Sequence, residues 1–437
     1  MIYIHVPFCR SFCTYCGFYS ELAPKCASRQ EEVDNKISSY CDKLIEEIYQ
    51  RQEEIRASST IDTLYIGGGT PSVLPLSVFK AIVNALTAVL SQEISDISDI
   101  SEISDISDIS EVPIDNGLTK ESTNNYPVRE NQSCYSVHRF TEFTVEVNPE
   151  DVIERGMDWL LGLKSLGVNR ISMGIQSFDD DILKWMNRRH NAQGANLAFN
   201  LLRLAGFDNI SVDLIFGLSH LSDKTWSDTI NLALSLGMEN NGELENREDN
   251  GESSNIDTRR GPEHISAYQL SVEEGSALEK LIERGRYVEA SEQLCRHQYD
   301  ILCEKLAEAG FEHYEISNFA RKGYRAVHNS AYWSHESYVG LGPGAHSFDK
   351  ENSRRFWNNP EGDVGGEVLT EEQLRLEHIM LGLRTARGVE AEYLRSHCDV
   401  EVLDACLREG SLVMIGDRIR IPESYFFISD AVIASLV

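Results

Sequence analysis

The feature that most constrains the fold is a repeated alternation of short apolar runs with longer amphipathic stretches. The short runs predict buried strands at 3–6, 63–66, 142–147, 170–175, 210–215 and 264–270. The amphipathic stretches between them predict helices, for example at 37–56, 76–90 and 191–205. Parallel strands joined by helices form an α/β sheet that closes into a full or partial (β/α)6 barrel. Ligands of such folds lie at the carboxyl ends of the strands.

Two polar segments interrupt this alternation. One of them repeats Ile-Ser-Asp/Glu six times between residues 94 and 111, and a period of three keeps one face of neither a helix nor a strand. Segments 91–136 and 239–261 carry net charges of −8 and −4, a large share of the total formal charge of −30. Their acidic composition, rich in Asn and Ser, predicts solvated insertions between the elements of the barrel.

The alternation stops near residue 311, and this change predicts a domain boundary. A chain of 437 residues is long enough for two domains. We expect a core domain at 1–310, which includes both insertions, and a C-terminal domain at 311–437. The second domain is predicted to hold a loop-rich stretch at 314–357, a helix at 371–384 and a small helical or winged-helix-like unit.

Composition and charge exclude several classes of protein. A formal charge of −30 repels the phosphate backbone of nucleic acids. No apolar run approaches the roughly 20 residues that span a bilayer. The first residues lack the basic cluster and apolar core of a signal peptide. We therefore expect a cytoplasmic protein with no nucleic-acid partner and no integral membrane span.

Three cysteines, Cys9, Cys13 and Cys16, crowd together directly after the first predicted strand. Three thiolates can each ligate one iron of a [4Fe–4S] cluster, which leaves the fourth iron without a protein ligand. An open iron can chelate S-adenosylmethionine (SAM), and an electron from the reduced cluster then cleaves the sulfonium bond of SAM. A zinc site is the alternative, although structural zinc sites usually have four ligands in pairs and the sequence has no second pair.

A run of three glycines, followed by Thr70 and Pro71, lies directly after the second predicted strand. Backbone without side chains can approach a ligand closely and present polar groups to it. We therefore predict that Gly68, Gly69 and Thr70 take part in cofactor binding. A tight turn between strand and helix is the alternative interpretation.

The spacing of the three cysteines, together with the glycine run, resembles the radical SAM superfamily. The resemblance implies that Tyr3 contacts SAM and that Tyr15 contacts its adenine. Further residues that match SAM-binding positions of the superfamily are Glu146, Gln176, Arg188 and Asp213. Carboxylates suit the ribose hydroxyls and the amino group of SAM, and an arginine fork suits its carboxylate. Any one of these charged residues, taken alone, is better explained as a member of a surface ion pair, but five matches in order outweigh that interpretation.

Two groups within the superfamily share further motifs with this chain. Tyr-Ile-His-Val-Pro-Phe-Cys at the start and Gly-Gly-Gly-Thr-Pro-Ser after the second strand resemble oxygen-independent coproporphyrinogen III oxidase and the haem chaperone HemW family. The oxidase has a fourth cysteine two positions after the third, where this chain has Phe18. It also has an N-terminal extension, whereas the first strand predicted here begins almost at Met1. The segment that starts at His328 matches the HNxxYW motif associated with HemW-type proteins.

The resemblance to the HemW family implies that the chain binds haem and delivers it to haem-accepting proteins such as respiratory enzymes. It also implies an electron donor for the cluster. His328 is the predicted haem ligand and His335 and His346 are rival ligands, while a packed loop without a ligand role is the alternative for the motif. Coproporphyrinogen III dehydrogenase activity is not expected, and an oxidase that decarboxylates this porphyrinogen is the alternative function. RNA modification, a third function known for radical SAM enzymes, is disfavoured by the acidic charge.

Overall fold

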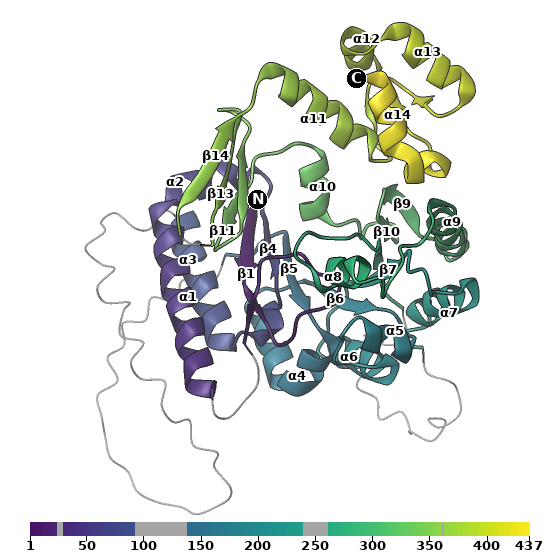
Figure 1. The fold of residues 1–437 in the computed structure, drawn as a ribbon. Helices are drawn as coiled ribbons and strands as arrows, with labels where there is room; N and C mark the ends of the chain where they lie inside the picture. The colour runs from purple at the N-terminus through teal and green to yellow at the C-terminus, as the bar shows by residue number, and fades with distance from the viewer. Residues whose placement is uncertain (24–28, 92–137, 239–260, 361) are drawn as a thin grey trace, which may run out of the picture.

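A computed structural model of the chain describes residues 1–23, 29–91, 138–238, 261–360 and 362–437. Its central element is a nine-stranded sheet with the order β11-β1-β4-β5-β6-β7-β8-β10-β9 (Figure 1). Six neighbouring strands of this sheet pair in parallel, namely β1 (Ile2–Val6), β4 (Thr63–Gly68), β5 (Glu142–Val147), β6 (Arg170–Gln176), β7 (Ile210–Phe216) and β8 (His264–Gln269). They coincide with the six predicted strands, so the α/β fold is confirmed. The sheet has two edges, as expected of a partial barrel.

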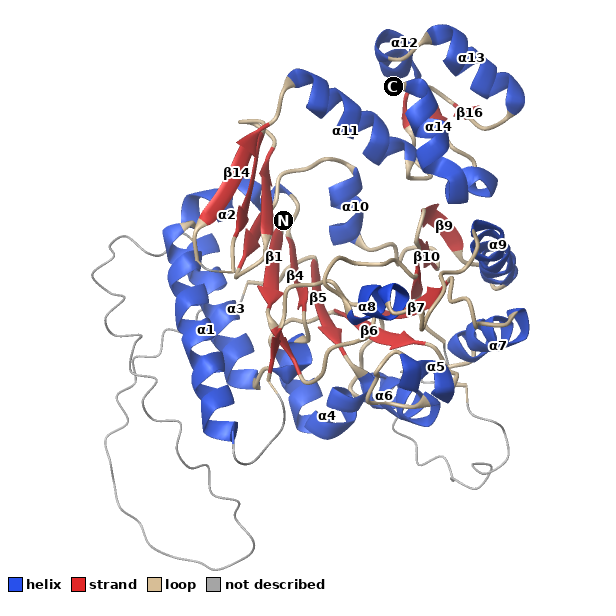
Figure 2. Cartoon of the chain, in the orientation of Figure 1, coloured by secondary structure: helices blue, strands red, loops and turns tan. Residues whose placement is uncertain are grey.

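The helices that connect the parallel strands cover the outer side of the sheet (Figure 2). They are α1 (Gln30–Gln50), α2 (Gln52–Ala57), α3 (Leu76–Leu90), α4 (Pro149–Ser165), α5 (Asp180–Trp185), α6 (Ala192–Leu204) and α7 (Asp223–Leu234), and α8 (Ala277–Glu283) and α9 (Glu292–Glu308) follow β8. The helix predicted at 76–90 is confirmed. The helix predicted at 37–56 begins earlier, at Gln30, because the buried Val33 extends its apolar face by one turn, and it is divided at Arg51 into α1 and α2.

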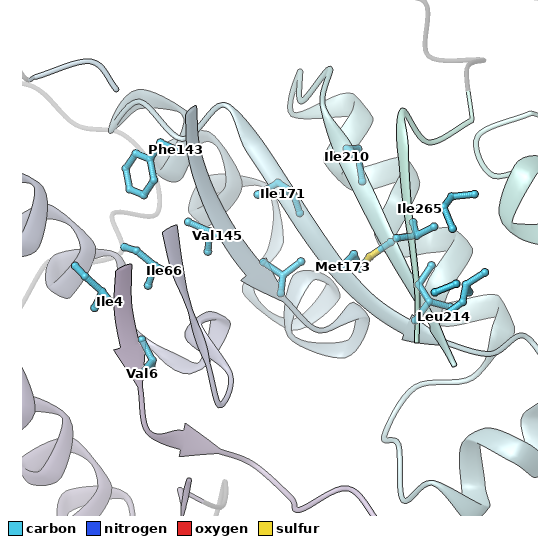
Figure 3. Close-up of a cluster of buried hydrophobic side chains, with 14 of the residues drawn as sticks. Ile4, Val6, Ile66, Phe143, Val145, Ile171, Met173, Ile210, Leu214 and Ile265 are labelled. Carbon is cyan, nitrogen blue, oxygen red and sulfur yellow. The ribbon is translucent and has the colours of Figure 1, made fainter. Parts of the chain in front are cut away.

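Apolar side chains of the parallel strands form the centre of the core (Figure 3). Ile4, Ile66, Val145 and Ile171 lie side by side on four neighbouring strands, and each is fully buried. Strands that are buried on both faces carry nearly continuous apolar runs, which explains the sequence pattern. Their burial fixes the register of the strands, and therefore also the positions of the residues that follow each strand.

The stretch at 314–357 is not the loop-rich segment that we predicted. β9 (Glu312–Glu315) and β10 (Asn318–Ala320) form an antiparallel hairpin beside β8, and α10 (Val327–Trp333) leads to β11 (Val339–Leu341), which pairs in parallel with β1. Strands of three or four residues are too short to show a periodic pattern. Because these strands extend the main sheet beyond residue 310, the domain boundary at that residue stays a prediction.

A second sheet, of three antiparallel strands, follows β11. Its strands are β12 (His346–Asp349), β13 (Arg354–Asn358) and β14 (Val364–Val368). The chain then enters α11 (Glu371–Leu383), where Thr370 and Gln373 form a capping box. The helix predicted at 371–384 is thereby confirmed.

The last residues form a small unit of helices and short strands. Its elements are β15 (Val389–Glu390), α12 (Ala391–His397), α13 (Val400–Glu409), β16 (Val413–Ile415), β17 (Arg418–Arg420) and α14 (Ser429–Leu436). The order strand, two helices and a hairpin agrees with the winged-helix-like unit predicted for the C-terminus. The rings of Phe426 and Phe427 lie 4.9 Å from His313 of β9 and 5.5 Å from Tyr299 of α9, so this unit contacts the core through aromatic side chains.

Apart from their ends, the two acidic segments lie outside the described residues, at 92–137 and 239–260. Their interpretation as insertions stays a prediction. In the part of the chain that is described, no helix is long and apolar enough to cross a membrane.

Candidate cofactor site

The three cysteines lie on one loop beyond the carboxyl end of β1. Cys9 ends the short strand β2 (Phe8–Cys9), which pairs with β3 (Glu21–Leu22). In the middle of the loop, the Thr14 Oγ1 donates to the carbonyl oxygen of Trp185 at 2.7 Å. The carbonyl oxygen of Thr14 accepts from the N–H of Leu278, also at 2.7 Å. The end of α5 and the start of α8 therefore fix the loop that carries the thiols.

Burial and two hydrogen-bond donors set the chemistry of these thiols. Burial raises the pKa of the Cys9 thiol and raises the pKa of Cys16 to about 11, so both are protonated at neutral pH before metal binds. The Thr70 Oγ1 donates to the Cys9 Sγ at 3.4 Å, and the Arg188 Nη1 donates to the Cys13 Sγ at 3.3 Å. Iron displaces thiol protons, and such donors stabilise the resulting thiolates.

The donor set fits an iron–sulfur cluster. In a [4Fe–4S] cluster each of three thiolates takes a different iron, so the three sulfurs stay apart. Among the described residues, no three His, Cys, Asp or Glu side chains lie close enough to hold one metal ion. The choice between a cluster and zinc therefore rests on the chemistry of the donor set, which is three thiols with no second pair. Phe18 stands where a fourth cysteine would lie, so the loop offers three sulfur ligands. The Phe18 side chain is 70% exposed.

The glycine run forms a tight turn against the start of the cysteine loop. The N–H of Gly69 donates to the carbonyl oxygen of Val6 at 2.8 Å. A Cβ added at Gly69 would lie 2.8 Å from the carbonyl oxygens of Val6 and Phe8, and one added at Gly68, where φ is +106°, would lie 2.6 Å from the His5 ring. Side chains are therefore excluded at both positions. The turn that we considered as the alternative is present, and the contact with a cofactor stays a prediction.

Glu146, near the end of β5, lies beside this turn. Its carboxylate accepts from the N–H of Gly68 at 3.1 Å and from the hydroxyl of Tyr65 at 2.7 Å. Burial raises the pKa of Glu146 to about 7, although both hydrogen bonds favour the charged form. The Tyr3 ring lies 6.0 Å from that of Tyr65. Glu146 can therefore hold or release a proton near neutral pH.

Arg188 connects the cysteine loop to the ends of β5 and β6. Besides its bond to Cys13, it donates through Nη2 to the Asn148 Oδ1 at 2.6 Å and to the carbonyl oxygen of Gly174 at 2.7 Å. Gln176 ends β6 at a bulge with a φ of 72°. Left-handed backbone at a residue other than glycine costs about 1–3 kcal/mol and occurs mostly at functional sites.

Asp213, Tyr15 and Tyr3 complete the set of predicted SAM residues. The Ser172 Oγ donates to Asp213 at 3.2 Å, and burial raises the pKa of this carboxyl to about 6. Burial also raises the pKa of Tyr15, which interacts with Arg188 and Cys13. The structure thus brings together the predicted residues of β1, β4, β5, β6 and β7 around the cysteine loop.

Sequence reasoning missed two residues of this site. Asn148 directly follows β5 and accepts from Arg188, and Tyr65 donates to Glu146. The position of Asn148 after a strand was a usable signal, because the carboxyl ends of parallel strands gather at one edge. Tyr65 gave no signal, since an aromatic residue inside a strand is most simply a core residue.

His328 lies at the opposite end of the parallel strands. Its Nδ1 lies 2.9 Å from the Oγ1 of Thr63, the first residue of β4, and its Nε2 lies 3.2 Å from the hydroxyl of Tyr332. Its backbone N–H donates to the carboxylate of Glu142, the first residue of β5, at 2.9 Å. The side chain is 1% exposed, and burial lowers its pKa to about 3. The predicted haem ligand is therefore buried and neutral, with both ring nitrogens hydrogen-bonded.

The two rival histidines lie nearer the surface. His335 stacks on Phe348 at 4.4 Å between ring centroids, and its Nε2 lies 3.0 Å from a carboxylate oxygen of Glu377. His346, on β12, is exposed, and its ring lies 5.8 Å from that of Trp357 at an interplanar angle of 28°.

The sequence model of the Radical SAM superfamily matches residues 3–233. This match covers more than half of the chain and includes the cysteine loop, the glycine turn, Glu146 and Arg188. The chain therefore belongs to the radical SAM superfamily, whose cofactors are a [4Fe–4S] cluster and SAM.

Curated relatives place the chain within that superfamily. The Heme chaperone HemW of Bacillus subtilis (strain 168) is 30% identical over 403 residues, which cover 89% of this chain and 84% of that protein. The Heme chaperone HemW of Synechocystis is 28% identical and covers 95% and 84% of the two chains. The mitochondrial Radical S-adenosyl methionine domain-containing protein 1 of Danio rerio is 27% identical and covers 94% and 73%. The chain is a member of the HemW family.

One solved structure shares the fold over nearly the whole chain. Coproporphyrinogen III oxidase (HemN) from Escherichia coli superposes with a TM-score of 0.63 and 17% identity, over 99% of this chain and 89% of that chain. Identity at this level indicates a shared fold and says nothing about the substrate.

Proposed function

We propose that the protein binds haem and delivers it to haem-accepting proteins such as respiratory enzymes, and that its SAM-liganded [4Fe–4S] cluster has a supporting or regulatory role. The observation that carries this proposal is the 30% identity to the Bacillus subtilis chaperone over 84% of that protein. The oxidase alternative is supported by a common fold at 17% identity. Phe18, at the position where the oxidase has its fourth cysteine, also favours the chaperone.

The same proposal assigns roles to the residues at the carboxyl ends of the strands. Cys9, Cys13 and Cys16 would hold the cluster, which supplies electrons to SAM when it is bound and reduced. Arg188 keeps Cys13 in hydrogen-bond contact while its Nη2 orients Asn148 at the end of β5. Glu146, with a pKa raised to about 7, accepts from the Gly68 N–H and so holds the glycine turn against the end of β5.

Partners and location follow from the chemistry of the cluster. A cluster that cycles between redox states needs an electron donor, which we expect to be another protein. The described cysteines are all free thiols, as is usual for proteins in a reducing compartment. We therefore propose a cytoplasmic protein.

Anaerobic reconstitution followed by two parallel assays tests the proposed function. We expect the reconstituted protein to bind haem with a defined Soret spectrum and to leave coproporphyrinogen III unconsumed in the presence of SAM and a reductant. The variant in which the three cysteines of the loop are replaced by Ala is the matched control for the cluster. Consumption of coproporphyrinogen without haem binding would replace this proposal with the oxidase.

A further inference from the structure

A chain of side-chain hydrogen bonds connects two of the three thiols of the cysteine loop. The Arg188 Nη1 donates to the Cys13 Sγ at 3.3 Å, and its Nη2 donates to the Asn148 Oδ1 at 2.6 Å. The Asn148 Nδ2 donates to the Thr70 Oγ1 at 3.2 Å, and the Thr70 Oγ1 donates to the Cys9 Sγ at 3.4 Å. We call the side chains of Arg188, Asn148 and Thr70 the Asn148 network.

The chemistry of the donors fixes the direction of each bond in this network. A guanidinium only donates, so Asn148 presents its oxygen to Arg188 and its amide nitrogen to Thr70. Because the Thr70 oxygen accepts from that amide, its own hydroxyl proton is directed at the Cys9 sulfur. The network therefore aims one donor at each of two different sulfurs.

The Asn148 side chain serves this network instead of its own helix. Asn148 is the N-cap residue of α4, a position at which asparagine normally accepts from the first N–H groups of the helix. In α4, all of whose residues are described, the Asn148 side chain makes no such bond. Asn191, the N-cap residue of α6, has the usual arrangement and accepts from the Gly194 N–H at 2.8 Å. Helix capping therefore does not explain the side chain of Asn148.

The hydrogen bond from Thr70 to Cys9 is shielded from water. Thr70 is 5% exposed and Cys9 is 8% exposed. A hydrogen bond is electrostatically stronger in such surroundings than in water, and each bond of a chain polarises the next. Hydrogen bonds to the sulfurs are among the features that set the reduction potential of an iron–sulfur cluster. Reduction makes the cluster more negative, so donors at its sulfurs stabilise the reduced form more than the oxidised form.

We infer that the Asn148 network raises the reduction potential of the cluster, with Asn148 as the positioning residue that aims the Arg188 and Thr70 donors. The inference rests on the cluster at the cysteine loop, which is part of the proposed function, and it is independent of haem binding. Reduction moves one electron from a low-potential one-electron donor to the cluster, while the protons of the network stay on their nitrogen and oxygen atoms. A higher potential makes the cluster easier to reduce, so the protein can use a wider range of electron donors.

Redox titration of the anaerobically reconstituted full-length protein, without SAM and with dithionite as the reductant, tests this inference. Electron paramagnetic resonance of the reduced cluster measures the fraction reduced at each potential. In Asn148→Asp the new carboxylate still accepts from Arg188 but also accepts from the Thr70 hydroxyl, which then no longer donates to Cys9. The ratio of reduced to oxidised cluster at a fixed potential should fall about tenfold, which corresponds to a midpoint about 59 mV lower for a one-electron couple.

Thr70→Val tests the donor to Cys9 without a change of charge. It should lower the midpoint by a smaller amount, because Arg188 keeps its bond to Cys13. Thr70→Ser keeps a hydroxyl and should restore the midpoint of the parent. Asn191→Asp is the matched control for the charge added in Asn148→Asp, since the Asn191 side chain is exposed and aspartate also caps helices. It should leave the midpoint unchanged.

Iron and sulfide contents, recorded for every variant, separate an effect on the potential from an effect on assembly. The inference is wrong if Thr70→Val holds a full cluster with the midpoint of the parent or a higher one, or if Asn191→Asp lowers the midpoint as much as Asn148→Asp does. It is also wrong if neither Thr70→Val nor Asn148→Asp assembles a cluster, because the network would then serve assembly. If the parent protein itself holds no cluster, the proposed cofactor and this inference fail together.

Discussion

The two ends of the parallel sheet are built differently. At the amino ends, His328, Thr63 and Glu142 form a closed set in which each polar group has a partner and the imidazole is kept neutral. At the carboxyl ends, Gln176 has left-handed backbone, and Glu146 has a pKa raised into the neutral range. Among these residues, left-handed backbone and a carboxyl whose pKa lies near neutral are therefore found only at the carboxyl ends. The role of His328 as haem ligand stays a prediction, and binding iron would require its imidazole to give up one of its two hydrogen-bond partners.

The largest effect should come from the cysteine loop. Replacing Cys9, Cys13 and Cys16 with Ala should abolish cluster assembly, whereas the parent should hold about four irons and four sulfides per chain. Iron content and the visible spectrum measure this. A triple variant that still assembles the cluster would contradict its assignment to this loop.

His328→Ala probes the opposite end and should act on stability. Removing a buried ring and leaving Thr63 without its partner should cost about 2–4 kcal/mol of unfolding free energy. The cluster spectrum should stay unchanged, because the thiols lie at the other end of the strands. Denaturant unfolding and visible spectroscopy measure the two quantities. If the variant instead has the unfolding free energy of the parent and a changed Soret band of bound haem, His328 is the haem ligand. The difference between the two ends of the sheet would then not hold.

Arg188→Lys should sharpen the description of the carboxyl end. Lysine keeps the charge but cannot reach Cys13, Asn148 and Gly174 with one planar fork. We expect SAM affinity to fall about tenfold, which corresponds to about 1.4 kcal/mol, with cluster content retained. Equilibrium dialysis with SAM measures this loss. An unchanged affinity for SAM would show that Arg188 does not contribute to SAM binding. Arg189→Lys is the matched control, since Arg189 pairs with Glu150 and Asp151 instead.

Glu146 should give the smallest effect, and one that depends on pH. Burial raises its pKa from 4.5 to about 7, so the folded protein holds this proton more tightly than the unfolded chain. The resulting stabilisation is complete below pH about 4.5 and is lost as the pH rises through about 7. Relative to the parent, Glu146→Gln should therefore gain about 1 kcal/mol between pH 6 and pH 7. Anaerobic urea unfolding without SAM, at both pH values, measures the gain. Parallel pH profiles of the two proteins would show that the carboxyl is not perturbed.

The parallel core could be predicted from the sequence because burial on both faces makes each strand a continuous apolar run. Short edge strands such as β9 and β11 could not, since their pairing depends on the sheet that is already formed. The cysteine loop was evident from its spacing after a strand. The position of His328 could not be predicted, because the motif identifies residue types and not the end of the sheet at which they lie. His346 and Trp357 come together only through the register of β12 and β13.

Haem transfer tests the central claim most directly. The reconstituted protein, loaded with one equivalent of haem, is mixed with the apo form of a haem-accepting respiratory protein, and the Soret bands of donor and acceptor are followed. We expect haem to leave this protein and appear in the acceptor faster than it does from free haem at the same concentration, with no coproporphyrinogen consumed in a parallel reaction. Haem that stays bound, or that reaches the acceptor no faster than free haem, would contradict the chaperone function.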